Sequence, residues 1–261
     1  MSTSAEKVAA LRRSLATDGL DGELSRALPL GHVGADAVLP GGLRIGALHE
    51  VYAADPVHSA PACAFATALA LRLGGTKILV WVATDFSSLE FGAPYANGFL
   101  ELGLDPARLL FVRMPNGEDA LRAATDILAC TGVGALVIEI PGPVKALDLT
   151  ASRRLYLAAA HKSVSVILLR PGATPEASAA ETRWLVHAAT SPPLREEDWG
   201  IPRLNVQLLR NRHGELGNWE MKWDCGNGLF KQPDNTNSTP HHSDLAAASF
   251  DGSLAAQGGL Q

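Results

Sequence analysis

The sequence GALHEVYAADPVHSAP occupies residues 46–61 and passes into an alanine-rich segment, Cys63–Leu73. The apolar run Leu48–Tyr52 predicts a β-strand, and Cys63–Leu73, which ends at the helix-stopping pair Gly74-Gly75, predicts a helix. A loop between a strand and a helix N-terminus is a place where many α/β proteins bind phosphate groups. We therefore compare this loop with the phosphate-binding pattern G-x-x-x-x-G-K-[ST].

The loop lacks the residues with which that pattern holds phosphate. Ala53 and His58 occupy the two glycine positions, Ser59 occupies the lysine position, and Ala60 occupies the position of the metal-binding hydroxyl. The side chains of Ala53 and His58 obstruct the approach of a phosphate to the backbone, and Asp55 adds a repulsive charge. We therefore expect no catalytic residue and no nucleotide cofactor here, whereas weak anion binding at the helix N-terminus near Ser59 stays open.

Outward from this stretch, apolar strands alternate with helices. Strands are predicted at Ile78–Val82, Leu109–Val112, Ala135–Ile138 and Val164–Leu169, and helices at Tyr95–Leu102, Asp119–Ala129 and Thr150–His161. Strands that are apolar along their whole length and alternate with helices indicate a mostly parallel sheet covered on both faces. The expected fold class is therefore α/β, with a three-layer core. Phe91, Tyr95 and Phe99 recur at helical spacing and are expected in that core.

The pattern changes after Arg170. Residues Gly172–Ala180 are small and polar, which predicts an irregular, mobile loop. Leu204–Leu209 and Asn218–Trp223 predict two strands around the turn residues His213-Gly214. Because the connection is short, we expect a C-terminal antiparallel hairpin at the end of the sheet.

Three segments are expected along the chain. Apolar residues at helical spacing predict an N-terminal helical segment within residues 1–27, and residues 28–230 form the core domain. Residues 231–261 are rich in Asn, Ser, His, Ala and Gly, which predicts a disordered C-terminal tail.

The composition indicates a globular protein without a general affinity for nucleic acid. Of the 261 residues, 47% are hydrophobic and 19% are charged, which supplies enough apolar material for one sizeable core. The formal net charge is −5, whereas a general electrostatic grip on nucleic acid usually needs a basic face. A local basic patch stays open, because net charge does not say where the charges lie.

The same residues favour a cytoplasmic protein. Cys63, Cys130 and Cys225 are far apart in sequence, which favours free thiols in a reducing compartment over a metal site. The longest apolar run is shorter than the roughly 20 residues that span a bilayer, and Met1–Leu15 lacks the apolar core of a signal peptide. We therefore expect no contact with a membrane.

Motifs around the loop resemble segments of RecA. Leu39–Gly46 and Glu50–Tyr52 are similar to the RecA segment that enters its phosphate-binding loop. A third motif, WVATD at 81–85, is similar to the second RecA strand, and its Asp85 lies near the position of RecA's catalytic Glu. A fourth, ALVIE at 135–139, is similar to the Walker B strand, with Glu139 in place of the Asp. The resemblance implies a RecA-like core built around a non-functional phosphate-binding loop.

A finer resemblance, over about residues 28 to 225, is to the ImuA family of RecA-related proteins from bacterial SOS mutagenesis operons. The motifs that carry it occur in order: GALHEV at 46–51, GAPYA at 92–96, LGLDP at 102–106, RLLFVR at 108–113, LTASRRL at 149–155, TRW at 182–184 and LLRNRHG at 208–214, followed by Trp219. One departure lies at 120–122, ALR, where the family pattern has a Trp after the Leu.

This resemblance implies a non-catalytic accessory protein of SOS-induced translesion DNA synthesis. The partners that it implies are an ImuB-like relative of the Y-family polymerases and an error-prone polymerase of the polymerase III alpha type, with RecA and DNA as further candidates. Catalytic residues do not come with the resemblance. Two alternatives stay open: a divergent DNA-dependent ATPase with a non-standard loop, and a cell-division inhibitor similar to SulA.

Six residues are candidate contacts to a partner or to DNA: Arg153, Arg154, Arg183, Trp184, Arg210 and Arg212. The first two begin a predicted helix and offer guanidinium groups to phosphates, although a solvated helix face is an equal alternative. The next two place a cation beside a large ring, for which the alternative is a helical Trp buried in the core. The last two lie at a hairpin end, which is either a contact surface or an ordinary solvated turn.

Overall fold

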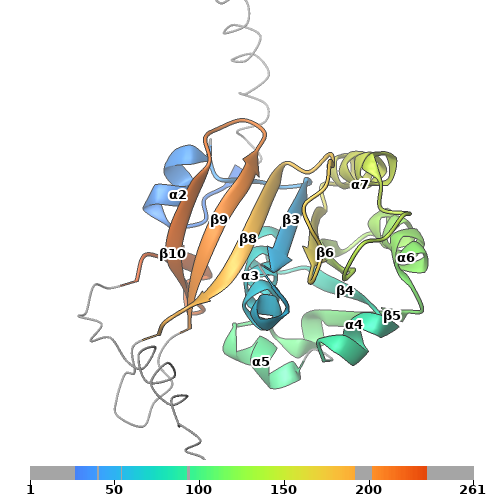
Figure 1. Ribbon diagram of the computed structural model, residues 1–261, viewed down its shortest axis with the longest axis horizontal. Coiled ribbons are helices and arrows are strands. Elements are labelled where there is room, and N and C mark those ends of the chain that lie inside the picture. The colour runs from blue at the N-terminus through green and yellow to red at the C-terminus, as the bar shows by residue number, and fades with distance from the viewer. Residues whose placement is uncertain (1–26, 40, 54, 93–94, 192–201, 234–261) are drawn as a thin grey trace, which may run out of the picture.

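The computed structural model of the chain describes residues 27–39, 41–53, 55–92, 95–191 and 202–233. Within these residues, nine strands form one large sheet (Figure 1). A separate two-stranded ladder pairs β1 (Ala27–Leu28) with β2 (Leu43–Arg44) in antiparallel register. This ladder directly precedes the strand that enters the degenerate loop.

Six neighbouring strands of the large sheet are parallel. In spatial order they are β8 (Thr182–Ala189), β3 (Leu48–Ala53), β7 (Ser165–Arg170), β6 (Val133–Glu139), β4 (Ile78–Thr84) and β5 (Leu109–Met114). Beyond β8 the sheet continues in antiparallel order through β9 (Arg203–Asn211), β10 (Gly217–Asp224) and β11 (Leu229–Lys231). The predicted α/β class, the mostly parallel sheet and the C-terminal antiparallel hairpin are confirmed, and the arrangement is consistent with a RecA-like core.

Helices lie on both faces of the parallel strands, which gives the three layers seen in Figure 1. On one face, α3 (Ser59–Gly74) packs against β3, β6, β7 and β8. On the other face, α6 (Gly117–Ala129) packs against β4, β5 and β6, and α7 (Leu149–Lys162) packs against β3 and β7. Shorter helices complete the layers: α2 (Val33–Val38), α4 (Asp85–Glu90) and α5 (Ala96–Glu101).

Two hydrophobic clusters fill the spaces between sheet and helices. Side chains alternate between the faces of a strand, so β7 sends Ile167 and Leu169 into the cluster under α3. It sends Val166 and Leu168 into the cluster under α6 and α7. This burial on both faces explains why the strand is apolar along its whole length.

Local interactions fix where these elements begin. Asn116 Oδ1 accepts a hydrogen bond from the Asp119 N–H at the start of α6, and Asp148 Oδ1 accepts one from the Ala151 N–H at the start of α7. Gly46, in the turn before β3, has a φ of 69° and approaches Ser163 closely, since a Cβ on Gly46 would lie 3.0 Å from the Ser163 Cα. Glycine is therefore required where the turn meets the end of α7.

The strands and helices that periodicity predicts are present, with ends shifted by a few residues. Strand β8 was not predicted, although its buried residues alternate with less buried ones, as in a half-buried strand. The predicted N-terminal helix lies outside the described residues. So does the predicted tail from residue 234 onward, and Lys231, where that tail was predicted to begin, is the last residue of β11. Among the described helices, none combines the length and apolar character needed to cross a membrane.

Candidate functional site

A groove of about 700 Å³ lies at the carboxyl ends of the parallel strands, where α/β sheets usually bind ligands. Its walls come from the first turns of α3, from α5 with the loop before it, and from β10 and β11. Among its lining residues are Ser59, Ala60, Cys63 and Thr67 from α3, Phe91, Tyr95 and Phe99 near α5, Glu139 from β6, and Trp223 and Lys231 from the C-terminal strands. Apolar side chains predominate in this lining.

The degenerate loop has the strand–loop–helix layout of a phosphate-binding loop, as predicted, with a short 3-10 turn, η1 (Pro56–His58), before α3. Two of its polar side chains, those of Asp55 and Ser59, are bonded to the protein's own backbone. Asp55 Oδ1 accepts a hydrogen bond from the Val57 N–H at 2.9 Å. The Ser59 hydroxyl donates to the Pro56 carbonyl at 2.8 Å. The carboxylate of Asp55 thus takes a backbone donor that a phosphate would need.

His58, at the second glycine position, ties the loop to the neighbouring strand β8. Its Nδ1 accepts a hydrogen bond from the Ala188 N–H at 3.2 Å. Its ring also meets the ring of His187 edge-on, with 5.1 Å between the centroids. The imidazole therefore holds a structural position, in addition to obstructing a phosphate.

Glu139 ends β6 and is 6% exposed, at the position of a metal-binding acid. Its Oε2 accepts a hydrogen bond from the Trp81 indole N–H at 2.9 Å, and its Oε1 accepts one from the Ser87 hydroxyl. Burial raises the pKa of this carboxyl, and the two hydrogen bonds partly oppose that effect. Both oxygens are thus held by the protein's own donors.

Two further residues, Asp85 and Cys63, could take part in chemistry near this edge. Asp85, the first residue of α4, pairs with Arg113 of β5, with 2.8 Å between its Oδ1 and the Arg113 Nη2. Burial, with a smaller contribution from the Glu139 carboxylate, raises the pKa of the Cys63 thiol to about 12. This thiol is therefore neutral at physiological pH and is a poor nucleophile.

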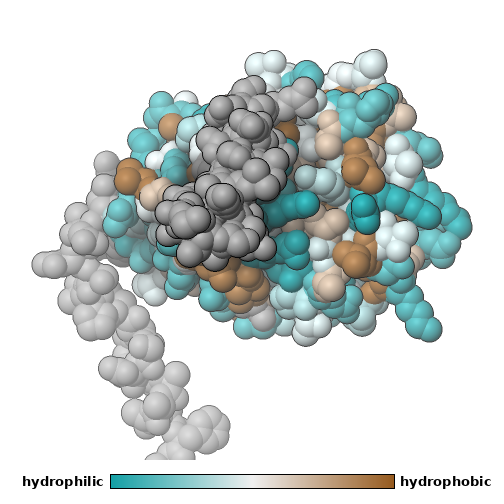
Figure 2. Space-filling model, turned by 90° about the horizontal axis from the view of Figure 1, so that it is seen from above, coloured by the Kyte–Doolittle hydropathy of each residue, from teal (hydrophilic) through white to brown (hydrophobic). Residues whose placement is uncertain are grey.

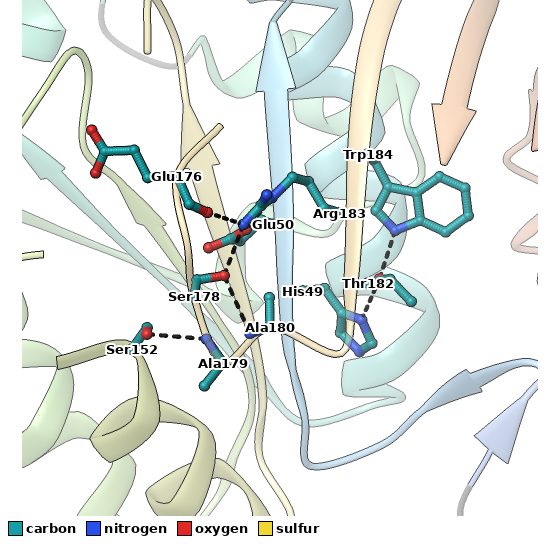
Figure 3. A network of polar contacts seen from close by, with 10 residues as sticks. All are labelled: His49, Glu50, Ser152, Glu176, Ser178, Ala179, Ala180, Thr182, Arg183 and Trp184. Atoms are coloured by element: carbon teal, nitrogen blue, oxygen red, sulfur yellow. Dashed lines mark hydrogen bonds and ion pairs between the residues drawn. The ribbon is translucent and has the colours of Figure 1, made fainter. Parts of the chain in front are cut away.

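A buried polar network links β3, β8 and residues 172–180, which we call the strap (Figure 3). The Arg183 Nε donates to Glu50 Oε2 at 2.7 Å. The Arg183 Nη2 donates to Ser178 Oγ at 3.0 Å and to the Glu176 carbonyl. The strap is irregular, as predicted, and these bonds anchor it over the sheet. The Arg183 guanidinium therefore bonds within the protein rather than facing solvent as a contact to a partner or to DNA.

The burial of Trp184 leaves it no surface to offer to a partner or to DNA, which corrects its place among the candidate contacts. It lies on strand β8 rather than on a helix and is fully buried in the core. Its indole N–H donates to Thr182 Oγ1 at 2.8 Å, and the same oxygen lies 2.8 Å from His49 Nδ1. An indole whose ring is buried and whose N–H is bonded has no free surface for stacking.

The remaining candidates lie on α7 and at the hairpin end. Arg153 and Arg154 are exposed on α7, and Arg212 is exposed just after β9. The Arg212 guanidinium lies 5.2 Å from the centre of the Tyr156 ring of α7. Arg210 is half-buried on β9. The structure thus brings the hairpin end onto α7, which the sequence did not predict.

The aromatic residues near α5 are only partly in the core, which corrects another prediction. Phe99 is buried and packs on Trp81, with 5.5 Å between ring centroids. Tyr95 is 71% exposed, and both Tyr95 and Phe91 line the groove. Helical spacing placed them together, but α5 begins at Ala96, after Tyr95.

Sequence reasoning did not find the partners of Glu139. Trp81 and Ser87 lie 58 and 52 residues before it in the chain, so no short-range motif joins the three. The available signal was a Trp in an otherwise aliphatic strand, because a buried indole N–H needs an acceptor. In the part of the chain that the structure describes, no group of three or more His, Cys, Asp or Glu residues is placed to hold a metal ion.

The sequence of the chain is similar to those of two curated proteins. No protein-family model matches the chain. The chain is 36% identical over 219 residues to Protein ImuA of Caulobacter vibrioides strain NA1000 / CB15N, in an alignment that covers 77% of this chain and 85% of that protein. The identity and both shares are the same for Protein ImuA of Caulobacter vibrioides strain ATCC 19089 / CIP 103742 / CB 15.

Proposed function

This chain belongs to the ImuA family, which is associated with SOS mutagenesis, and from that premise we propose that it is a non-catalytic accessory protein of translesion DNA synthesis. It acts by binding other proteins of an error-prone replication complex. The partners that we propose are an ImuB-like relative of the Y-family polymerases, an error-prone polymerase of the polymerase III alpha type, and RecA. The proposed compartment is the cytoplasm.

One observation carries the non-catalytic part of this proposal: the polar side chains that would face a phosphate or a metal already bond to the protein. Asp55 caps the Val57 N–H, and the Ser59 hydroxyl donates to a backbone carbonyl. Glu139 accepts from two internal donors. A bound nucleotide would have to break these hydrogen bonds and would leave the Asp55 carboxylate facing its phosphates, which is electrostatically unfavourable.

The groove supports a role in binding rather than in turnover. At the edge of the sheet where a nucleotide would lie, the protein offers mainly apolar walls, together with the exposed Tyr95. Apolar and aromatic surfaces of this kind are typical of protein interfaces and offer little to a triphosphate.

The proposal is tested by mixing the purified full chain with the ImuB-like partner of the same organism. We expect a complex at micromolar concentration in size-exclusion chromatography, with the same affinity in the presence and absence of ATP and magnesium. Ser59→Ala and Asp85→Asn should bind the partner as tightly as the original chain, because neither residue serves a nucleotide. ATP should not be hydrolysed, with or without single-stranded DNA.

Two results would contradict the proposal in different ways. Failure to form any complex at micromolar concentration would count against the accessory role. Saturable ATP hydrolysis that Ser59→Ala or Asp85→Asn abolishes would favour the divergent DNA-dependent ATPase instead.

A further inference from the structure

An arginine of the hairpin end lies over a tyrosine of α7, a helix that also carries two arginines. Arg212 covers the Tyr156 ring at 5.2 Å. Arg153 precedes Tyr156 by three residues on α7, and residues three apart are neighbours on one side of a helix. Arg154, two residues before Tyr156, lies on a different side. The helix and the hairpin thus contribute cations to the same place.

Arg210 lies on the same face of the sheet as this cluster. It is directly opposite Arg183 in the β8–β9 ladder, and opposite residues of an antiparallel pair share a face. That face is the one that the strap and α7 cover, because Arg183 bonds to Ser178 of the strap and the Ala179 N–H donates to Ser152 of α7. We call Arg153, Tyr156, Arg210 and Arg212 the α7–hairpin surface.

Within the part of the chain that the structure describes, the arginines of this surface differ from their neighbours in having no carboxylate partner. Arg183 has Glu50 as its counter-ion at 2.7 Å, and the His213 Nε2 lies 3.0 Å from Glu181 Oε1. Among the described residues, Arg153, Arg210 and Arg212 form no ion pair with a carboxylate. Glu215 in the hairpin turn and Glu176 in the strap are exposed, and Figure 3 shows that the Glu176 carboxylate points away from Arg183.

The placement of Arg210 opposite Arg183 has a physical cost. Like charges directly opposite each other on neighbouring strands destabilise a sheet. Glu50 compensates Arg183, but no described carboxylate compensates Arg210. An anion bound from outside the chain would reduce the electrostatic repulsion between the two guanidinium groups. The relief of this repulsion would favour anion binding at Arg210.

From this juxtaposition we propose that the α7–hairpin surface binds the phosphate backbone of nucleic acid without reading its base sequence. The planar guanidinium fork matches phosphate oxygens, and backbone contacts need charge rather than an apolar core. The coloured part of the face in Figure 2 is largely hydrophilic, with scattered apolar side chains, and the large exposed apolar residues of α7 and the hairpin turn are Leu149, Leu157 and Leu216. An interface with protein would need a contiguous apolar centre.

The overall charge of the chain shapes this binding. With a formal net charge of −5, most of the protein repels nucleic acid, so contact is confined to the α7–hairpin surface and is strongly weakened by salt. The inference deepens the proposed function, on which it rests: an accessory protein of DNA synthesis would be held at the template by a weak contact that ignores sequence.

The test is fluorescence anisotropy of a labelled oligothymidine 20 nucleotides long with the full chain, titrated at several potassium chloride concentrations. Each phosphate contact on a single strand contributes about −0.7 to the slope of log K against log salt, so three arginines predict a slope of roughly −2. We expect the same effect from each of three variants, Arg153→Gln, Arg210→Gln and Arg212→Gln. Each should reduce the magnitude of the slope by about 0.7 and weaken binding roughly eightfold at 50 mM salt.

The matched control is Arg122→Gln, an exposed arginine on α6 that is paired with Glu118 at 2.6 Å. It should bind as the original chain does. Tyr156 acts as a positioning residue for Arg212, so Tyr156→Leu should reduce the slope and Tyr156→Phe should restore it. If Arg210→Gln lowers the melting temperature, its weaker DNA binding could result from unfolding. The inference is then judged from the variants of the two exposed arginines, Arg153 and Arg212.

Absence of salt-dependent binding by the original chain, or equal binding by the Arg122→Gln control and all three variants, would overturn the inference. The same variants are assayed for the complex with the ImuB-like partner. Loss of that complex with unchanged DNA binding would make this surface a protein interface and would also overturn it. An intact complex without DNA binding leaves the proposed function standing, whereas DNA binding without any complex removes the proposed function alone.

Discussion

At the scale of single residues, His49 shows how a buried imidazole makes stability depend on pH. It lies on β3 and is fully buried. Its Nε2 lies 2.9 Å from the Arg44 carbonyl, which can only accept, so Nε2 carries the proton. Its Nδ1 lies 2.8 Å from the Thr182 hydroxyl, which then donates to it. Burial lowers the pKa of His49 from 6.5 to about 4, so the folded protein keeps the ring neutral.

We expect His49 to reduce stability in mild acid. Between pH 6.5 and about 4 the unfolded chain binds a proton that the folded chain does not, so the free energy of unfolding falls as the pH decreases through that window. From pH 7.5 to pH 5 the contribution is about 2 kcal/mol. Urea unfolding at the two values should show that the stability advantage of the original chain over His49→Gln narrows by this amount. If the difference in stability between the two proteins does not change with pH, His49 binds its proton equally well in the folded and the unfolded chain.

At the scale of elements, the pairing of β3 with β8 rests on an ion pair as well as on the ladder. Glu50 and Arg183 are register partners on these strands, and their side chains are 2% and 12% exposed. Arg183 also holds the strap through Ser178, so one guanidinium joins two strands and a loop. A pair this buried is sensitive to the loss of either member, since the remaining charge stays in a poorly solvated place.

We expect Arg183→Met to lower the free energy of unfolding by about 3–5 kcal/mol, because it removes the hydrogen-bonded counter-ion of the buried Glu50 carboxylate. The double variant Glu50→Leu/Arg183→Met should be more stable than Arg183→Met alone, since it removes the stranded charge. Chemical denaturation of the original chain, of the single variants Arg183→Met and Glu50→Leu, and of the double variant forms a double-mutant cycle. An effect below about 1 kcal/mol for Arg183→Met would show that the pair is effectively solvated.

At the scale of the whole molecule, the C-terminal strands share a core with the parallel sheet. Phe230 of β11 is fully buried, with its ring centroid 5.1 Å from that of Phe65 on α3 and 4.9 Å from that of Trp223 on β10. One hydrophobic cluster extends from Leu30 to Phe230. The described part of the chain is therefore expected to unfold as one cooperative unit.

We expect Phe230→Ala to destabilise the whole molecule, by about 3–5 kcal/mol, because it leaves a cavity between β11 and α3. Thermal unfolding followed by circular dichroism should show one transition at a lower temperature. Leu157→Ala, which removes a side chain that is 56% exposed, serves as the control and should change stability by less than about 0.5 kcal/mol. Two separate transitions in Phe230→Ala would instead mean that the C-terminal strands unfold independently.

The sequence by itself determined the architecture and the chemistry of the loop. Both depend on patterns that a short window contains: apolar runs for strands such as Ile78–Thr84, helical spacing for α6, and residue identity at Ala53, His58 and Ser59. A missing lysine or glycine is missing in every conformation, so the loop's degeneracy needed no coordinates. The ordered motifs likewise identified the family, which the 36% identity confirms.

Only the tertiary structure decided which side chains meet. Trp184 was ambiguous in sequence because a large ring beside an Arg fits an interface as well as a core, and the β8–β9 pairing buried it. Glu139 found its donors on β4 and α4, and Arg212 found Tyr156 on α7. The contacts of Glu139 and of Arg212 join residues more than 50 positions apart, and no local propensity encodes them. They follow from the order in which the strands pair, which is fixed by burying the whole hydrophobic surface at once.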